Sequence, residues 1–400
     1  MSRKALFFQT ISSSRGPAAV AFVLTALLLS CDRPSKAVAQ PATSSLDSWL
    51  PAAPPQSRAA DDAARFLAGL PGKPGTAFAA LEQTDAWAGH RKELDVAWNA
   101  IEAKTMGAMR EFQKTELSAP AAEKSTVFYP FSGPDSLIMS VFYPRNPVYI
   151  MVGLEPPGTL PDPKQFPEKT LSKKLADSRE TVYSVLHRSF FITRQMDRQF
   201  RGQVTDGLFP PILNLLVREN RTIVGYRYVR INDDGNVVER PEGEKVPDRG
   251  IEVDFTQNGS SQVQRLFYFS VNLSDKSMQE NQPFLKFLDH MKGCSTFMKA
   301  TSYMTHHADF SMIRDRILAN SATVLQDDSG IPYKYFTGAW NVQLFGGYEK
   351  PYGSFRWLEQ PDLRKAYNTN SKPLAFKIGY GFSRIPSNLQ LARQAAPTGK

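Results

Sequence analysis

Apolar residues change their spacing along this chain, and the change falls near residue 125. Before it, they recur at helical spacing in residues 58–70, which Pro71 and Gly72 close, and again in residues 79–117. After it, short apolar runs alternate with helical patterns. This alternation is typical of βαβ units, so we predict an α/β fold. The expected architecture is an open, mostly parallel sheet with helices on both faces, preceded by an N-terminal helical segment.

The clearest βαβ unit covers residues 125–155. A strand is expected at 126–131, a helix at about 135–143, and a second strand at 148–152 that is apolar throughout. A continuous apolar run is typical of a strand that is buried on both faces. Pro130 lies within the first strand and cannot donate a ladder hydrogen bond, which argues against a fully paired central position.

The same patterns predict the remaining elements. Helices are expected at 171–200, 212–219, 284–292 and 296–306, followed by a helix that Asp309 caps; strands are expected at 223–231, 251–256, 263–273, in WNVQLFGGY and in PLAFKIGYGF. We therefore assign residues 58–120 to the helical region and residues 121–395 to one α/β domain.

The first thirty residues have the composition of a secretion signal. Arg3, Lys4 and Arg15 precede an apolar run at 18–29, which is too short to cross a bilayer easily. The run ends in Leu28-Leu29-Ser30-Cys31, which resembles the lipobox of bacterial lipoproteins, in which the cysteine is diacylated. The alternative is an ordinary signal that is cleaved near residues 37–39. We expect a cell-envelope protein, anchored in the membrane through lipid on Cys31 and facing the periplasm or the exterior.

The residues after the lipobox extend this interpretation. Asp32 resembles the signal that keeps enterobacterial lipoproteins at the inner membrane. Residues 31–57 are rich in Pro, Ala and Ser without periodicity, which predicts an extended tether.

Charge and cysteine usage narrow the class of partner. The net charge of +9 falls to +6 without residues 1–30, and the excess is scattered rather than gathered in a patch. We therefore expect no nucleic-acid partner, while attraction to anionic lipid remains open. The two cysteines are Cys31 and Cys294, so acylation of the first leaves the second without a disulfide partner.

A polar loop follows the first strand of the βαβ unit, and an acidic residue follows the second. The loop contains Ser132, Gly133 and Asp135, and Glu155 lies 22 residues after Gly133. Ligands bind outside the carboxyl ends of strands in open α/β sheets, and an acidic residue about twenty positions after a glycine turn holds ribose hydroxyls in dinucleotide sites. The other interpretation is that Ser132 and Asp135 cap the following helix. The two interpretations are compatible.

This unit resembles the class I S-adenosylmethionine-dependent methyltransferases, whose second strand ends in a similar Gly-x-acid-x pattern. The resemblance covers about thirty residues. The loop departs from the family because its one glycine precedes Pro134, which has no N–H to offer a ligand. An α/β sheet of this general kind is expected, and the cofactor stays unknown.

Two further strings carry polar side chains. The first contains Gln326, Asp327, Asp328 and Ser329 at the end of an expected strand, and these residues are candidates for ligand binding. The second contains Lys299, Ser302, Tyr303 and His306 at helical spacing, which would present a nucleophile and a base on one helix face. A solvated turn and a structural role are the respective alternatives. We find no metal-binding motif.

The strings YPFSGPD, GLEPPG, KATSYM, LQDDSGIPY and PLAFKIGYGF together resemble a family of uncharacterised bacterial envelope proteins. The resemblance implies a common unit over about residues 80–395 and supplies no mechanism. We expect a protein that binds a small polar ligand or an envelope partner. The alternative is an enzyme with a carboxylate-based site.

Overall fold

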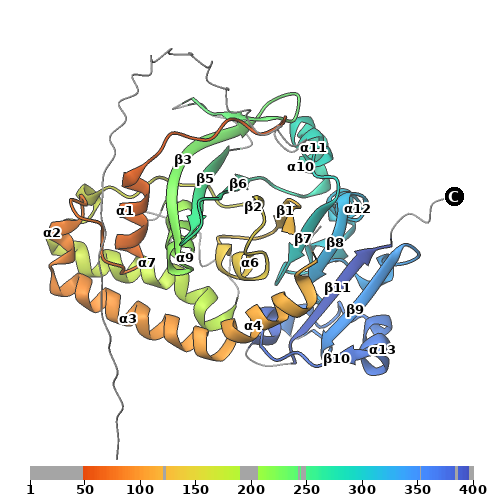
Figure 1. The fold of residues 1–400 in the computed structure, drawn as a ribbon. Coiled ribbons are helices and arrows are strands. Elements are labelled where there is room, and N and C mark those ends of the chain that lie inside the picture. Colours follow the sequence, from red (N-terminus) through yellow and green to blue (C-terminus); the bar gives the residue numbers. More distant parts are fainter. Residues whose placement is uncertain are drawn as a thin grey trace, which may run out of the picture. The chain divides into compact units, whose positions relative to one another are not determined.

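An open sheet of mixed strand direction is the framework of the fold (Figure 1). The computed structural model describes residues 48–119, 123–189, 206–241, 244, 249–351, 353–382 and 386–395. In this part of the chain the strands lie in the order β10-β9-β11-β8-β7-β1-β2-β6-β5-β3-β4. Their bounds are β1 (Val127–Pro130), β2 (Val148–Gly153), β3 (Arg221–Ile231), β4 (Val237–Glu239), β5 (Arg249–Gln257), β6 (Val263–Ser270), β7 (Cys294–Met298), β8 (Ser321–Gln326), β9 (Trp340–Gly346), β10 (Ser371–Lys372) and β11 (Asn388–Gln394).

Parallel pairing is confined to the centre of the sheet and to the β9–β10 pair. Strands β8, β7, β1, β2 and β6 are parallel to one another, whereas β5, β3 and β4 on one flank and β11 on the other pair antiparallel. The prediction of an α/β fold with an open sheet is confirmed, and the prediction of a mostly parallel sheet is wrong. The sequence pattern marks an apolar run without marking its direction, and short links such as the one between β3 and β4 permit antiparallel pairing.

The helices cover both faces of this sheet. Their bounds are α1 (Arg58–Leu67), α2 (Ala79–Glu82), α3 (Asp85–Ile101), α4 (Gly107–Phe112), α6 (Ser136–Phe142), α7 (Glu168–Arg188), α9 (Phe209–Arg218), α10 (Asp275–Glu280), α11 (Gln282–Asp289), α12 (Ser311–Asn320) and α13 (Pro361–Thr369). Two π-helical segments, η2 (Glu102–Met106) and η3 (Gln113–Leu117), continue α3 and α4. Single 3₁₀ turns lie at η4 (Pro163–Gln165), η5 (Met304–His306), η6 (Ala308–Phe310), η7 (Tyr333–Tyr335), η8 (Gly353–Phe355) and η9 (Gly379–Phe382).

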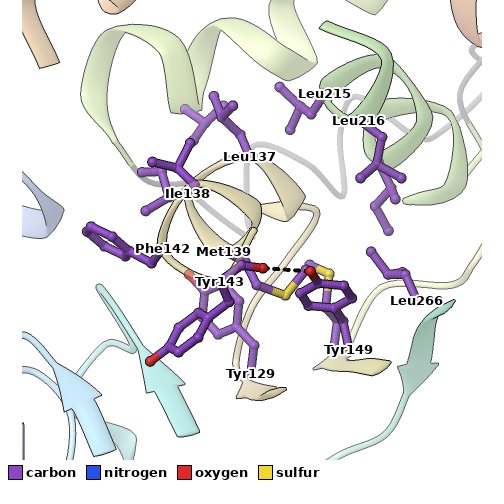
Figure 2. Close-up of a cluster of buried hydrophobic side chains, with 14 of the residues drawn as sticks. Tyr129, Leu137, Ile138, Met139, Phe142, Tyr143, Tyr149, Leu215, Leu216 and Leu266 are labelled. Atoms are coloured by element: carbon purple, nitrogen blue, oxygen red, sulfur yellow. Dashed lines mark hydrogen bonds between the residues drawn. The ribbon is translucent and has the colours of Figure 1, made fainter. Parts of the chain in front are cut away.

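The central strands separate two hydrophobic cores, because successive side chains of a strand point to opposite faces. Tyr129 of β1 belongs to one core, together with residues of α3, α4, α6, α7 and α9. Phe128, the neighbouring residue, belongs to the other, together with residues of α10, α11 and α12. Figure 2 shows the first core, where α6 and α9 lie over the sheet and the Tyr149 hydroxyl donates to the Tyr143 carbonyl oxygen at 2.6 Å. A sheet buried on both faces explains the continuous apolar run of β2.

Pro130 is accommodated at the end of β1. It is in register with Val152 of β2, whereas the pairing of β1 with β7 involves Val127 and Phe128. β1 is thus a central strand in spite of its proline, since the proline lies where pairing with β7 has ended.

Several predicted elements differ from the structure. Residues 296–306 are not a helix but the end of β7, a loop and η5. PLAFKIGYGF contains η9 instead of a strand, and the N-cap position of α12 is Phe310, so Asp309 does not cap that helix. Of the helix expected at 171–200, Glu168–Arg188 is observed, and residues 190–205 lie outside the described part.

The last ten residues of the predicted tether pack against the sheet. Trp49 and Leu50 are buried, the Trp49 carbonyl oxygen accepts from Val237 N at 2.9 Å, and Gln56 forms a bridge with Gly225 of β3. A tether ending at residue 57 is therefore too long. Ser45–Lys400 forms one compact unit.

Candidate functional site at the carboxyl ends of the parallel strands

The order of the parallel strands defines a position where a ligand is expected. If these strands are numbered along the chain, β6, β2, β1, β7 and β8 read 3-2-1-4-5 across the sheet. The chain thus builds outward from β1 first in one direction and then in the other. In open α/β sheets, the crevice outside the carboxyl ends of the strands at this switch point is where ligands bind.

A cavity of about 890 Å³ lies at this position. Its walls come from the segments that follow β1, β2, β6 and β7, together with η8 and Tyr380. The lining residues are Tyr129, Phe131, Ser132, Gly133, Asp135, Val152, Gly153, Leu154, Glu155, Val271, Asn272, Leu273, Lys299, Ala300, Thr301, Ser302, Met304, Phe310, Gly353, Ser354, Phe355 and Tyr380.

The structure brings six of the predicted site residues to this cavity, from three different loops: Ser132, Gly133, Asp135, Glu155, Lys299 and Ser302. The other six are not among its lining residues: Tyr303, His306, Gln326, Asp327, Asp328 and Ser329. Five of these six are buried, and His306 is half-buried. Asp327 and Ser329 form hydrogen bonds to the lining residues Ala300 and Thr301, and Asp328 bonds to Tyr303, the neighbour of the lining residue Ser302.

Asp135 caps α6 and also forms a buried ion pair. Its Oδ1 accepts from Ile138 N at 3.2 Å, which satisfies one of the free N–H groups of the first helical turn. Its Oδ2 lies 2.9 Å from Lys299 Nζ, and both side chains are 1% exposed. Ser132 is not a cap, because its hydroxyl donates to the Gly133 carbonyl oxygen at 3.0 Å and the Val152 carbonyl oxygen at 3.3 Å.

The Asp135–Lys299 pair is supported by neutral partners. Tyr129 donates its hydroxyl to Asp135 Oδ2 at 3.1 Å, and Lys299 Nζ also donates to the carbonyl oxygen of Ser189. Burial, together with the charge of Asp135, raises the pKa of Tyr129 well above its usual value, so this phenol stays protonated as a donor.

Glu155 reaches the cavity because the backbone before it leaves space. A Cβ on Gly153 would lie 2.8 Å from the Tyr268 hydroxyl and 3.1 Å from Glu155 Oε2, so a larger residue would displace both side chains. Tyr268 donates to the backbone carbonyl oxygen of Glu155 at 2.7 Å, which fixes the chain beyond β2. Glu155 is 8% exposed and lines the cavity.

The loop after β7 has an unusual backbone. Ala300, Ser302 and Tyr303 have φ angles of 50°, 55° and 56°, and Phe131 after β1 has a φ of 59°. The left-handed region is unfavourable for residues other than Gly, Asn or Asp, and such residues gather at functional sites. Four of the six positive-φ non-glycine residues in the described part are therefore at or next to this cavity. The prediction that Lys299, Ser302, Tyr303 and His306 share a helix face is wrong.

Neighbouring segments hold the Lys299–Tyr303 loop in place. Asp327 Oδ2 accepts from Ala300 N at 2.9 Å, and Asp328 Oδ2 accepts from the Tyr303 hydroxyl at 2.6 Å. The Tyr380 hydroxyl accepts from Ser302 N at 3.1 Å. Asp327 and Asp328 thus hold the loop that lines the cavity, and they do not themselves line it.

Ser329 and Gln326 complete this support. Ser329 Oγ accepts from Thr301 N at 2.9 Å, and both ends of the Gln326 amide bond to the backbone of Ile331, at 2.7 and 2.8 Å. The string LQDDSGIPY is therefore a buried turn, and the alternative of a solvated turn is wrong.

The buried carboxyl pair has raised pKa values. Burial raises the pKa of Asp328 to about 7, and the neighbouring charge of Asp327 adds to the shift. Burial likewise raises the pKa of Asp327, which hydrogen bonds from Ser329 and Ala300 oppose. Burial lowers the pKa of His306 to about 4, so its imidazole is neutral near pH 7.

Sequence reasoning missed the aromatic wall of the cavity. Phe310, Phe355 and Tyr380 come from segments that are far from β1 in the sequence, and none of them was a candidate site residue, although Tyr380 lies in the string PLAFKIGYGF. The concentration of aromatic and glycine residues between 335 and 382 was the available signal. The charged lining residues are Asp135, Glu155 and Lys299. The described residues contain no group of three potential metal ligands among His, Cys, Asp and Glu.

No family model, curated protein or solved structure matches this chain. The resemblance to a family of envelope proteins therefore stays a prediction. None of the helices in the described ranges is long and apolar enough to cross a membrane. Cys31, Asp32 and the expected signal peptide lie outside the described residues.

Proposed function

We propose that this protein is a lipid-anchored binding protein of the bacterial cell envelope, whose cavity takes a small ligand with adjacent hydroxyl groups, such as a ribonucleoside. The observation that carries the proposal is the position of Glu155. Its carboxylate lies at the carboxyl end of β2, next to the switch point, and lines the cavity. A carboxylate at this point of an open α/β sheet accepts hydrogen bonds from the two hydroxyls of a ribose.

The charges around the cavity favour a ligand without phosphate. Lys299 is the cation among the lining residues, and it is paired with Asp135. Asp135 also places a carboxylate on the N-terminus of α6, and Pro134 has no N–H to donate. A phosphate in the cavity would lie near the carboxylates of Asp135 and Glu155 and would be repelled by them, so an uncharged or cationic ligand fits better.

A binding experiment with the full chain tests this proposal. Adenosine, 2′-deoxyadenosine and adenosine monophosphate are titrated by calorimetry against the wild type, Glu155→Gln and Glu349→Gln. Glu349 is exposed and outside the cavity lining, so it controls for the loss of one carboxylate. We expect adenosine to bind most tightly and Glu155→Gln to weaken it by about tenfold or more, because a charge-assisted hydrogen bond contributes about 1.5–3 kcal/mol.

Four results would contradict the proposal: no binding of adenosine, equal affinity for adenosine and 2′-deoxyadenosine, equal affinity of the wild type and Glu155→Gln, or tighter binding of the monophosphate than of adenosine. The lipid anchor has a separate test. Replacement of Cys31 by Ala should release the protein from membranes into the soluble fraction, and unchanged membrane association would refute the anchor.

The alternative is an enzyme on a methyltransferase-like fold, and the strained loop is the observation that favours it. Non-glycine residues with positive φ at a cavity are typical of active sites. S-adenosylmethionine, which carries a ribose and a cationic centre, fits the charge argument. Tritium transfer from labelled S-adenosylmethionine to an envelope extract distinguishes the two functions, since a binding protein transfers none.

A further inference from the structure

The cavity is wide enough for its two ends to be lined by different kinds of side chain. It extends from the segment after β6 to the segment after β7, and β2 and β1 lie between these strands. Three strand spacings of about 4.8 Å separate the two ends by about 14 Å. Its volume of about 890 Å³ is near the upper limit of the 300–1,000 Å³ that is usual for small-molecule pockets. Glu155 belongs to the β2 side.

The polar side chains at the β7 end are already engaged within the protein. Lys299 pairs with Asp135, the Thr301 hydroxyl donates to the Ser329 carbonyl oxygen at 2.5 Å, and Ser302 Oγ lies 3.2 Å from the Tyr380 hydroxyl. Recognition of a polar group there would require breaking these contacts.

Aromatic rings form the remaining wall at this end. Phe355 lies 5.7 Å from Tyr380 and 5.0 Å from Tyr303, measured between ring centroids, and Phe310 lies 6.0 Å from Phe131. Phe310, Phe355 and Tyr380 are each half-buried and line the cavity. Their accessible ring surface is therefore available to a planar group, which gains stacking energy beyond the burial of its area.

We propose that the β7 end of the cavity is a second subsite, which binds a planar aromatic molecule beside the ligand at Glu155. The proposal deepens the proposed function by naming a second ligand class for the same cavity. The aromatic subsite is argued from the aromatic wall and the ribose site from Glu155, so an experiment can refute either one without refuting the other.

The test uses 2-naphthol, an uncharged planar aromatic, titrated by calorimetry against the full chain with and without saturating adenosine. The variants are Phe355→Ala, Phe355→Leu, Glu155→Gln and the control Tyr183→Ala. Tyr183 on α7 is also half-buried and is outside the cavity lining. The leucine variant removes the ring but keeps an apolar side chain of similar size. If its thermal midpoint equals that of the wild type, weaker naphthol binding in this variant is due to the loss of the ring and not to misfolding.

We expect Phe355→Ala and Phe355→Leu to weaken naphthol binding by about fivefold to tenfold, because each loses a ring–ring contact. Glu155→Gln and Tyr183→Ala should leave naphthol binding unchanged, and adenosine should not displace it. The subsite is refuted if naphthol does not bind, if adenosine displaces it, if Glu155→Gln weakens it, or if Phe355→Ala weakens it no more than Tyr183→Ala does. Naphthol binding that depends on Phe355 in a chain that does not bind adenosine would support the subsite and refute the ribose site.

Discussion

Two buried acidic clusters, one beside the cavity and one on the antiparallel flank, differ in how their charges are neutralised. On the flank, Glu252 of β5 bonds to Arg227 Nε at 2.6 Å and to Arg265 Nε at 2.8 Å. Asp254, also on β5, lies 3.7 Å from Arg265 Nε. Two carboxylates thus face two guanidinium groups.

The cluster beside the cavity has fewer cations. Asp135, Asp327 and Asp328 are three buried carboxyl groups, and Lys299 is the ammonium next to them. Neutral hydroxyl and amide donors, and not cations, hydrogen-bond to Asp328: the Tyr303 hydroxyl donates to its Oδ2, and Asn388 Nδ2 donates to its Oδ1 at 2.9 Å. Burying more carboxyl groups than cations costs folding free energy and raises the pKa values of Asp327 and Asp328, so this cluster beside the cavity points to a role in the site.

The largest expected difference comes from removing one cation from each cluster. Lys299→Met leaves Asp135 buried without its ammonium and should lower the free energy of unfolding by about 3–5 kcal/mol. Arg227→Met should cost less, about 1–2 kcal/mol, because Glu252 keeps its bond to Arg265. Urea denaturation of both variants measures the difference. An equal loss of unfolding free energy in the two variants would contradict the expectation that the cluster beside the cavity depends more strongly on its cation.

The pH dependence of stability should be the next largest effect. The pKa of Asp328 is raised to about 7 by burial, against an ordinary value of 3.8. The folded state therefore holds a proton that the unfolded state has lost between about pH 4 and pH 7, so the contribution of this group to stability falls as pH rises through that window.

Asp328→Asn removes the titrating carboxyl and should flatten this part of the stability curve, making the variant more stable relative to wild type at pH 8 than at pH 5. Asp254→Asn is the matched change on the flank, since burial and Glu252 raise the pKa of Asp254 to about 7 as well. Both variants should flatten the curve, but only Asp328→Asn should change ligand affinity. Thermal midpoints from pH 4 to pH 8 measure the stability curves, and ligand titrations at pH 4 and pH 8 measure the affinity. A change of ligand affinity in Asp254→Asn would contradict the expectation that only the cluster beside the cavity affects binding.

The smallest effect concerns backbone strain beside the cavity. Ala300 has a φ of 50°, so Ala300→Gly should raise the free energy of unfolding by about 0.5–1 kcal/mol. The same substitution at Ala100, which is exposed in α3, should lower it by about 0.5–1 kcal/mol, because glycine loses more backbone entropy in a helix. Chemical denaturation measures both, and the same sign for the two would show that the loop is not strained.

The candidate site was partly predictable because its residues follow two strands that the sequence identifies. The patterns at 126–131 and 148–152 predicted β1 and β2, and the carboxyl ends of parallel neighbours meet at one edge, so Ser132, Asp135 and Glu155 were expected together. Lys299 and Ser302 were identified for the wrong reason. Their spacing suggested a helix, whereas they follow β7 in a loop with positive φ that two other segments hold, the turn after β8 and Tyr380.

The sequence by itself determined the local elements: the helices between residues 58 and 117, the two strands of the βαβ unit and the cap at Asp135. These follow from periodicity and side-chain chemistry over a few neighbouring residues. Only the tertiary structure decided the direction of the flanking strands, the pairing of Lys299 with Asp135 and the aromatic wall from residues 310, 355 and 380. Such contacts join residues far apart in the chain, and their free energy depends on burial and on neighbours that no local pattern contains.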